Sequence, residues 1–107
     1  MRRIASVIGI PAESVDEYER LHAEAWPEVL AALTAGNVRN YSIFRQGDVL
    51  FSYFEYVGDD FDADMARVND DPATKRWHAL TDALQRPLPE RADGDRWMPI
   101  PEVFHLD

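Results

Sequence analysis

The sequence predicts an α+β protein with the ferredoxin-like order β-α-β-β-α-β, in which helices cover one face of an antiparallel sheet. Two observations support this prediction. Segments with the composition of strands alternate with segments that have the periodicity of helices, and a hairpin signal joins the second strand to the third. The chain has 107 residues, so residues 1–107 are expected to form one domain around one core.

Four segments have the composition of strands: residues 3–10, 38–45, 49–56 and 100–106. They are short and rich in β-branched and aromatic residues, and turn residues bound them. Between the second and the third, Gln46-Gly47-Asp48 predicts a tight hairpin. In the second strand, simple alternation places Arg39, Tyr41 and Ile43 on one face.

A long amphipathic helix is predicted after Ser14, because apolar or aromatic residues follow at a spacing of three or four. These residues are Val15, Tyr18, His22, Ala25, Trp26, Val29, Leu30 and Leu33. Ser14 as N-cap and Glu17 three positions later predict a capping box, and Gly36 followed by Asn37 predicts the end of the helix.

Proline marks two positions in the helical segments. Pro27 lies inside the long helix, where a proline costs about 3 kcal/mol, so we expect a kink or a split just before Trp26. After a short helix over residues 61–68, Asp71 as N-cap and Pro72 at the first helical position predict a helix over residues 72–84.

The third predicted strand is apolar on both faces. One face carries Val49, Phe51 and Tyr53, and the other carries Leu50, Phe54 and Tyr56. Because the predicted helices cover only one face of the sheet, an apolar face remains, and such faces mark interfaces. We therefore expect a homodimer whose sheets pack face to face. The alternative is a small-molecule pocket on that face of a single chain.

The chain is acidic and contains no cysteine. Its formal net charge of −9 argues against nucleic acid or an anionic membrane as a partner, because both are bound through clustered Lys and Arg. The absence of cysteine excludes disulfides, thiolate catalysis and zinc–thiolate sites. No apolar run has the length of a membrane helix and the N-terminus does not resemble a signal peptide, so we expect a cytoplasmic protein.

His22 is the first candidate for chemistry. It lies four residues after Tyr18 and four before Trp26, so the three side chains share one face of the predicted helix. The same face carries apolar residues and therefore points at the sheet. One interpretation is a core histidine with one satisfied hydrogen bond. The other is a general acid/base in an aromatic-lined pocket, since histidine titrates near neutral pH.

Two further aromatic residues have the same two interpretations. Tyr41 in the second strand and Trp77 in the last helix are either packing residues or parts of a carbohydrate site, since sugar rings stack on aromatic faces. The acidic stretch 59–64 lacks the glycine and the terminal glutamate of a calcium loop. It is typical of a solvated face, and no metal site is predicted.

Five short motifs are spread over nearly the whole chain. They are, in order, Glu17-Tyr18-Glu19-Arg20-Leu21-His22, Trp26-Pro27-Glu28, Asn40-Tyr41-Ser42-Ile43, Arg76-Trp77 ahead of Leu80-Thr81-Asp82, and Glu102-Val103-Phe104. Each motif alone is weak evidence. Taken together and in this order, they resemble the L-rhamnose mutarotase family, whose members have about the same length.

The resemblance implies a dimeric α/β barrel that interconverts the α and β anomers of a 6-deoxyhexose without cofactor or metal. L-rhamnose is the first substrate to expect. The resemblance also implies that His22 is the proton donor and that Tyr18, Tyr41 and the pair Arg76-Trp77 bind the sugar. Trp26 of the second motif is a further candidate for sugar binding. The family has a tryptophan at the position of Arg76, which leaves the sugar open, with L-fucose as an option.

Anomer exchange requires one proton at the ring oxygen of the sugar and the removal of another from the anomeric hydroxyl. We expect His22, as an imidazolium, to deliver the first, and Tyr18, Tyr41 or a water to orient or accept the second. Two other functions stay open. One is a cofactor-free monooxygenase or cyclase of the same dimeric fold, and the other is a dimer that binds sugar without catalysis.

Overall fold

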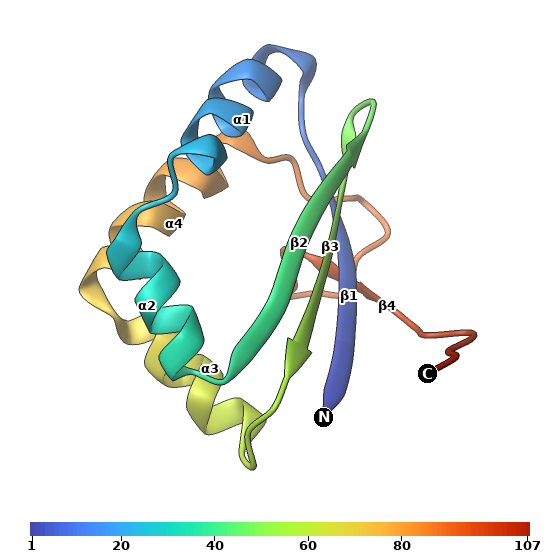
Figure 1. Ribbon diagram of the computed structural model, residues 1–107. Coiled ribbons are helices and arrows are strands. Elements are labelled where there is room, and N and C mark those ends of the chain that lie inside the picture. Colours follow the sequence, from blue (N-terminus) through green and yellow to red (C-terminus); the bar gives the residue numbers. More distant parts are fainter.

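An antiparallel sheet forms one layer of the molecule, and four α-helices form the other (Figure 1). The computed structural model describes residues 1–107. The strands are β1 (Arg2–Gly9), β2 (Val38–Gln46), β3 (Val49–Tyr56) and β4 (Met98–Ile100), and their order in the sheet is β2-β3-β1-β4. The predicted α+β class, the order of the elements and the hairpin between β2 and β3 are confirmed.

The long helix predicted in the first half is split into two. The helices are α1 (Val15–Ala23), α2 (Pro27–Ala35), α3 (Phe61–Asp70) and α4 (Pro72–Leu84). Trp26 is extended, with ψ 131°, and Pro27 is the first residue of α2, where its missing N–H has no cost. The predicted break at this proline is therefore confirmed.

The helix caps are confirmed in part. The Asp71 side chain accepts from the main-chain N–H of Thr74 at 3.0 Å, as expected for the N-cap of α4. The capping box expected at Ser14 and Glu17 is wrong. Ser14 ends a 3₁₀ turn with helical φ and ψ and makes no side-chain cap bond, while Glu17 pairs with Arg20.

A bulge in β2 turns Tyr41 toward the helices. The register with β3 shifts between Arg39 and Ser42, so that Asn40 and Tyr41 stand opposite a single residue. Asn40 has φ 51°, a left-handed conformation that asparagine tolerates better than most residues. The extra residue reverses the alternation. Tyr41 and Ile43 face the helices while Arg39 lies on the outer face, so the expected common face for all three is wrong.

The last strand is shorter and begins earlier than expected. β4 pairs with residues 5–7 of β1, and residues 101–107 form no regular structure. The expected strand over residues 100–106 is therefore wrong. Pro101 has no N–H with which to extend the ladder, and the chain then leaves the sheet on the side away from the helices (Figure 1).

The core lies between the sheet and the helices. Its two clusters are Ile8, Ile10, Tyr18 and Leu50, and Val29, Ala73 and Trp77. No helix covers the outer face of the sheet (Figure 1), where Phe44 is 65% exposed and Phe51 38%. The uncovered apolar face inferred from the sequence is confirmed, whereas the second copy expected to cover it stays a prediction.

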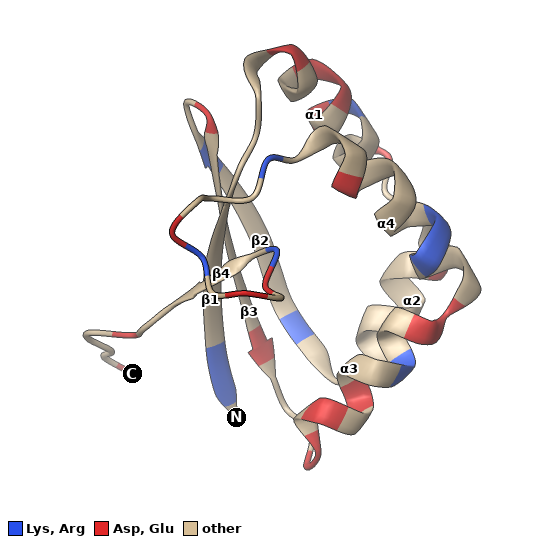
Figure 2. Cartoon of the chain, turned by 180° about the vertical axis from the view of Figure 1, so that it is seen from behind, with Lys and Arg blue, Asp and Glu red and all other residues tan.

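Charged residues are unevenly distributed over the two layers. Figure 2 shows most acidic segments on the helices and the connecting loops, whereas the middle of the strands carries few charges. None of the helices has the length and the apolar character needed to cross a membrane. The charged segments therefore lie mainly on the helical layer and in the loops, and the centre of the sheet is largely free of them.

Candidate functional site

A cavity of about 310 Å³ lies between the helical layer and β2. It is lined by Tyr18, His22, Tyr41, Ile43, Asn69, Trp77, His78, Thr81, Asp82, Gln85, Arg96 and Trp97. Four of the six residues predicted for the site are thus brought together from α1, β2 and α4. The volume is at the small end of the ~300–1,000 Å³ range of small-molecule sites.

His22 presents one free ring nitrogen to this cavity. Its Nδ1 lies 2.8 Å from the main-chain oxygen of Tyr18, one helical turn earlier. Because a carbonyl oxygen can only accept, Nδ1 carries the hydrogen and Nε2 has the lone pair. Burial lowers the pKa of His22 below its ordinary value, and the bond to the carbonyl partly offsets this effect. The ring is therefore neutral at pH 7, with Nε2 available as a proton acceptor.

Tyr18 lies directly beside His22. The two rings are stacked, with centroids 4.2 Å apart and planes at 26°. The Tyr18 side chain is buried, and its hydroxyl accepts a hydrogen bond from Nε2 of Gln85 at 3.2 Å. Burial raises the pKa of Tyr18, while the bond from Gln85 acts in the opposite direction. The phenol consequently stays protonated over the neutral range.

Tyr41 reaches the cavity from the opposite wall. The bulge in β2 places its ring against Phe54, with centroids 5.5 Å apart. The residue as a whole is 43% exposed, but desolvation of its phenol raises the pKa of Tyr41 to about 12. No protein group is hydrogen-bonded to this hydroxyl, so it is available to a ligand.

Trp77 is the aromatic residue of α4 that lines the cavity. Its ring meets His22 edge-on, with centroids 5.1 Å apart, and Trp26 packs on it at 5.3 Å. Trp26 does not itself line the cavity, nor does Arg76, which is exposed on α4. A direct contact of Trp26 or Arg76 with a sugar stays a prediction from the sequence.

The structure adds six polar residues that were not predicted for the site: Asn69, His78, Thr81, Asp82, Gln85 and Arg96. The last three are joined by hydrogen bonds. Nη2 of Arg96 donates to Oε1 of Gln85 at 3.2 Å and to the main-chain oxygen of Asp82 at 3.1 Å. The position of Gln85 could have been predicted from the sequence, because Trp77, Thr81 and Gln85 follow at a spacing of four and so share one side of a helix. Arg96 was not, because it lies in an irregular loop without periodicity.

An apolar extension of about 320 Å³ adjoins the polar cavity. The two share His22, Tyr41, Ile43 and Trp77, and the extension is completed by Ala25, Val29, Leu30 and Leu33. His22 therefore lies at the boundary between a polar and an apolar region. A ligand with hydroxyls on one side and an aliphatic group on the other fits this arrangement.

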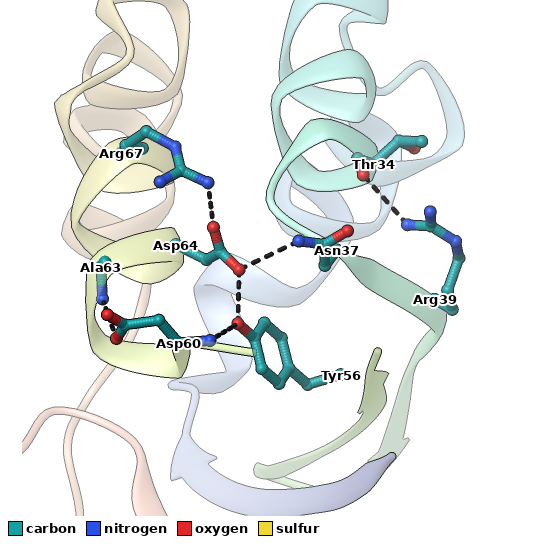
Figure 3. Close-up of polar contacts among 8 residues, drawn as sticks. All are labelled: Thr34, Asn37, Arg39, Tyr56, Asp60, Ala63, Asp64 and Arg67. Carbon is teal, nitrogen blue, oxygen red and sulfur yellow. Dashed lines mark hydrogen bonds and ion pairs between the residues drawn. The ribbon is translucent and has the colours of Figure 1, made fainter. Parts of the chain in front are cut away.

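A second cluster of polar side chains surrounds Asp64 where α3 meets β3 and the end of α2 (Figure 3). The Asp64 carboxylate accepts from the Tyr56 hydroxyl, from Arg67 and, at 3.0 Å, from Nδ2 of Asn37. The Tyr56 oxygen accepts in turn from the main-chain N–H of Asp60 at 3.0 Å. The bond from Tyr56, followed by that from Asn37, holds the pKa of Asp64 below its ordinary value.

The carboxylate at the centre of this cluster is engaged within the protein. Asp64 is 5% exposed, and both of its carboxylate oxygens accept hydrogen bonds from protein side chains. The solvated face expected for the acidic stretch 59–64 is therefore wrong for Asp64, whose role is to join α3 to the sheet. No group of three or more His, Asp or Glu side chains is arranged to hold a metal ion.

Comparisons with known proteins agree with these findings. A family model described as L-rhamnose mutarotase matches residues 3–106. An L-fucose mutarotase from Xanthomonas campestris is 37% identical, over 99% of this chain and 89% of the relative. An L-rhamnose mutarotase from Bacteroides thetaiotaomicron is 32% identical, over 85% of each chain. The crystal structure of an L-rhamnose mutarotase from Formosa agariphila has the same fold, with a TM-score of 0.78, 23% identity and complete coverage of both chains.

Proposed function

This chain belongs to the L-rhamnose mutarotase family and is an isomerase, and from that premise we propose that it interconverts the α and β anomers of a 6-deoxyhexose by general acid/base catalysis at His22. The family inferred from the sequence motifs is thus confirmed. The proposal for His22 rests above all on its neutral ring, whose free Nε2 faces a cavity also lined by Tyr18 and Tyr41.

The state of His22 sets the order of the proton transfers. The sequence led us to expect an imidazolium that donates first, but a lowered pKa favours the neutral ring. Nε2 therefore takes the proton of the anomeric hydroxyl while the ring oxygen of the sugar is protonated by a second group. The bond between the anomeric carbon and the ring oxygen breaks and leaves an open-chain aldehyde.

Ring closure reverses these steps. The aldehyde turns about its bond to the neighbouring carbon, so that the same hydroxyl attacks its other face. His22, now an imidazolium, returns its proton to the aldehyde oxygen, and the proton of the attacking hydroxyl goes back to the second group. No proton or electron is gained or lost over the cycle. One base and one acid are sufficient to accelerate the reaction, because it already proceeds in water without a catalyst.

The cavity supports a 6-deoxyhexose as substrate, and L-fucose and L-rhamnose are the sugars named in the relatives. The polar region meets the ring hydroxyls, and the extension lined by Ala25, Val29 and Leu33 suits the methyl group that replaces a hydroxymethyl in such sugars. Trp77 offers a flat apolar wall between the two regions.

Saturation-transfer NMR between the two anomeric protons tests the reaction directly. We expect transfer with L-fucose or L-rhamnose in the presence of the protein, and weaker transfer with the parent hexoses that carry a hydroxymethyl group. In His22→Ala the rate should fall by about 10²–10⁴-fold, the usual contribution of one acid/base group. Full activity of His22→Ala would exclude this residue as the catalyst.

The same experiment separates the alternatives. Binding of a sugar without faster anomer exchange would favour a binding dimer over an enzyme. No effect on any aldose, combined with thermal stabilisation by an aromatic polyketide, would favour a cyclase or monooxygenase of this fold. The polar residues that line the cavity favour a sugar over a polycyclic aromatic compound.

We further propose that two copies pack through the outer faces of their sheets. Phe44 and Phe51 supply the exposed apolar surface, and no helix of the same chain covers it. Sedimentation analysis should give a dimer for the natural chain and a monomer for Phe44→Glu. The matched control is Leu30→Glu, an exposed apolar residue on the helical layer, which should remain a dimer. A monomeric natural chain would overturn this assembly.

A further inference from the structure

Three side chains form a directed row of hydrogen bonds that ends at the cavity. Arg96 donates through Nη2 to Oε1 of Gln85 at 3.2 Å, and Gln85 donates through Nε2 to the Tyr18 hydroxyl oxygen, also at 3.2 Å. Arg96 is itself held by Asp82, through the main-chain oxygen at 3.1 Å and the carboxylate at 3.5 Å. All four residues line the cavity.

The direction of this row follows from the groups in it. A guanidinium has only donors, so the side of the Gln85 amide that faces Arg96 must be its oxygen. The NH₂ group of Gln85 then faces Tyr18, and it can only donate. The Tyr18 oxygen is therefore an acceptor toward Gln85, and its own proton has to point elsewhere. The Tyr18 hydroxyl donates to no protein group and Tyr18 lines the cavity, so its proton is free to point into the cavity.

We propose that Gln85, oriented by Arg96, is a positioning residue that turns the Tyr18 proton into the cavity and makes Tyr18 the acid that protonates the ring oxygen of the sugar. This inference rests on the proposed function. It names the second group that the reaction needs beside His22. Tyr41 is less suited to that role, because no hydrogen bond fixes the direction of its hydroxyl.

The two partners complement each other in position and in state. His22 offers a lone pair at Nε2, and Tyr18, stacked on it with centroids 4.2 Å apart, offers a proton. As Tyr18 gives up its proton, the N–H of Gln85 stabilises the negative charge on the phenol oxygen. On ring closure Tyr18 recovers the proton from the attacking hydroxyl, while His22 returns its own proton to the anomeric oxygen.

The substitution Gln85→Glu reverses the direction of the row with almost no change in shape. A carboxylate cannot donate, so it accepts from Arg96 on one side and from the Tyr18 hydroxyl on the other. The Tyr18 proton then points away from the cavity. We expect kcat for anomer exchange to fall roughly ten- to a hundredfold, with KM changed by less than about threefold. The control Gln46→Glu, at the exposed end of β2, should keep the natural rate.

Combination with Tyr18→Phe distinguishes positioning from a general structural effect. If Gln85 acts through Tyr18, Gln85→Glu adds no further loss of kcat once the Tyr18 hydroxyl is absent. Gln85→Leu should lose less than Gln85→Glu, because the Tyr18 hydroxyl then turns freely. An unchanged kcat in Gln85→Glu, or a full additional loss in the Tyr18→Phe background, would overturn the proposal.

A measurement without substrate keeps this inference separate from the proposed function. Titration of ¹³Cζ-labelled tyrosine, assigned with Tyr18→Phe, follows the ionisation of Tyr18 alone. The pKa of Tyr18 should rise in Gln85→Leu, which loses the donor, and rise further in Gln85→Glu, which adds a negative charge. A pKa of Tyr18 that is the same in all three proteins would contradict the row, even if the natural chain exchanged no anomers.

Discussion

The cavity around His22 and the cluster around Asp64 both hold titratable side chains between the helices and the sheet, yet the surroundings of these side chains differ. At Asp64, donors from three elements meet one carboxylate and lower its pKa. At the cavity, His22 and Tyr41 are desolvated without a counter-charge, so the pKa of His22 is lowered and that of Tyr41 is raised to about 12. Hydrogen bonds thus stabilise the charged form of Asp64 in spite of its burial, whereas burial stabilises the neutral forms of His22 and Tyr41.

This difference separates a structural group from a functional one. A carboxylate with all of its bonding capacity used inside the protein contributes to stability and has no capacity left for a ligand. A neutral ring with a free nitrogen, next to a hydroxyl without a protein partner, leaves that capacity open. The two regions should therefore respond in opposite ways to substitution.

The largest effects are expected from removing the central residue of each region. His22→Ala should lower the rate of anomer exchange by about 10²–10⁴-fold, while the urea midpoint changes little. Asp64→Ala should lower the urea midpoint strongly, because it leaves Tyr56 and Asn37 without their acceptor. The exchange rate of its folded fraction should remain within about twofold of the natural rate.

Both properties are measured on the same two samples, by saturation transfer and by urea denaturation. If Asp64→Ala slowed exchange as much as His22→Ala does, the Asp64 cluster would belong to the active site. If His22→Ala lowered the urea midpoint as much as Asp64→Ala does, the histidine would be a core residue.

Gly58→Ala probes the packing of the Asp64 cluster without removing any of its groups. A Cβ at this position would lie 2.5 Å from the Tyr56 hydroxyl, 2.6 Å from the Asp64 carboxylate and 2.7 Å from Nδ2 of Asn37. At least one of the three has to move, so we expect a loss of about 1–3 kcal/mol in the free energy of unfolding. Urea denaturation measures this loss, and an unchanged midpoint would show that the cluster is looser than the structure indicates.

Much of the fold could be predicted because its signals are local. Asp71-Pro72 and Gly47 lie at a cap and at a turn whose chemistry depends only on neighbouring residues. The prediction that Arg39 shares a face with Tyr41 and Ile43 was wrong. Simple alternation assumes a strand without an inserted residue, and β2 has a bulge at Asn40. The strand expected over residues 100–106 was wrong because composition alone does not supply a pairing partner.

The candidate site was predictable to the extent that helical spacing defines it. Tyr18 and His22 are four residues apart, and their stacking follows from that spacing. Arg96 was missed because an irregular loop brings it to α4, and Asp64 was misjudged because its partners Tyr56 and Asn37 are distant in the sequence. Contacts of this kind depend on the finished fold.

The exchange rate and the stability should depend on pH in different ranges, because the first follows His22 and part of the second follows Asp64. The exchange rate requires neutral His22, so kcat/KM should be constant above pH ~6.5 and fall about tenfold per pH unit below the lowered pKa of His22. The same shifts make stability depend on pH. In the folded protein the pKa values of His22 and Asp64 are both lowered, so each group contributes fully to the free energy of unfolding above its unfolded pKa. That contribution is lost as the pH falls through the folded pKa. That window lies below about pH 6.5 for His22 and below about pH 4 for Asp64.

Activity should therefore decline on acidification before the part of the stability that depends on Asp64. Saturation transfer between about pH 5 and pH 8, with urea denaturation down to about pH 3, follows the two separately. An acid limb of kcat/KM centred above pH ~6.5 would contradict the desolvated histidine and favour an imidazolium stabilised by a negative charge.

The smallest effect is expected for Tyr41→Phe, which should change stability and sugar affinity in opposite directions. The Tyr41 hydroxyl is desolvated and has no protein partner, so its removal should leave the free protein as stable as before or slightly more stable. The same change should weaken sugar binding roughly three- to tenfold, the loss of one hydrogen bond.

The matched control is Tyr53→Phe, which should not affect affinity. The Tyr53 hydroxyl donates to Glu55 at 2.9 Å on the outer face of the sheet. Titration calorimetry of Tyr41→Phe, set beside its thermal unfolding, gives both quantities. A substitution that lowers stability and affinity together would place Tyr41 with the structural groups around Asp64, whereas opposite signs place it with His22 among the groups that the fold leaves open for a ligand.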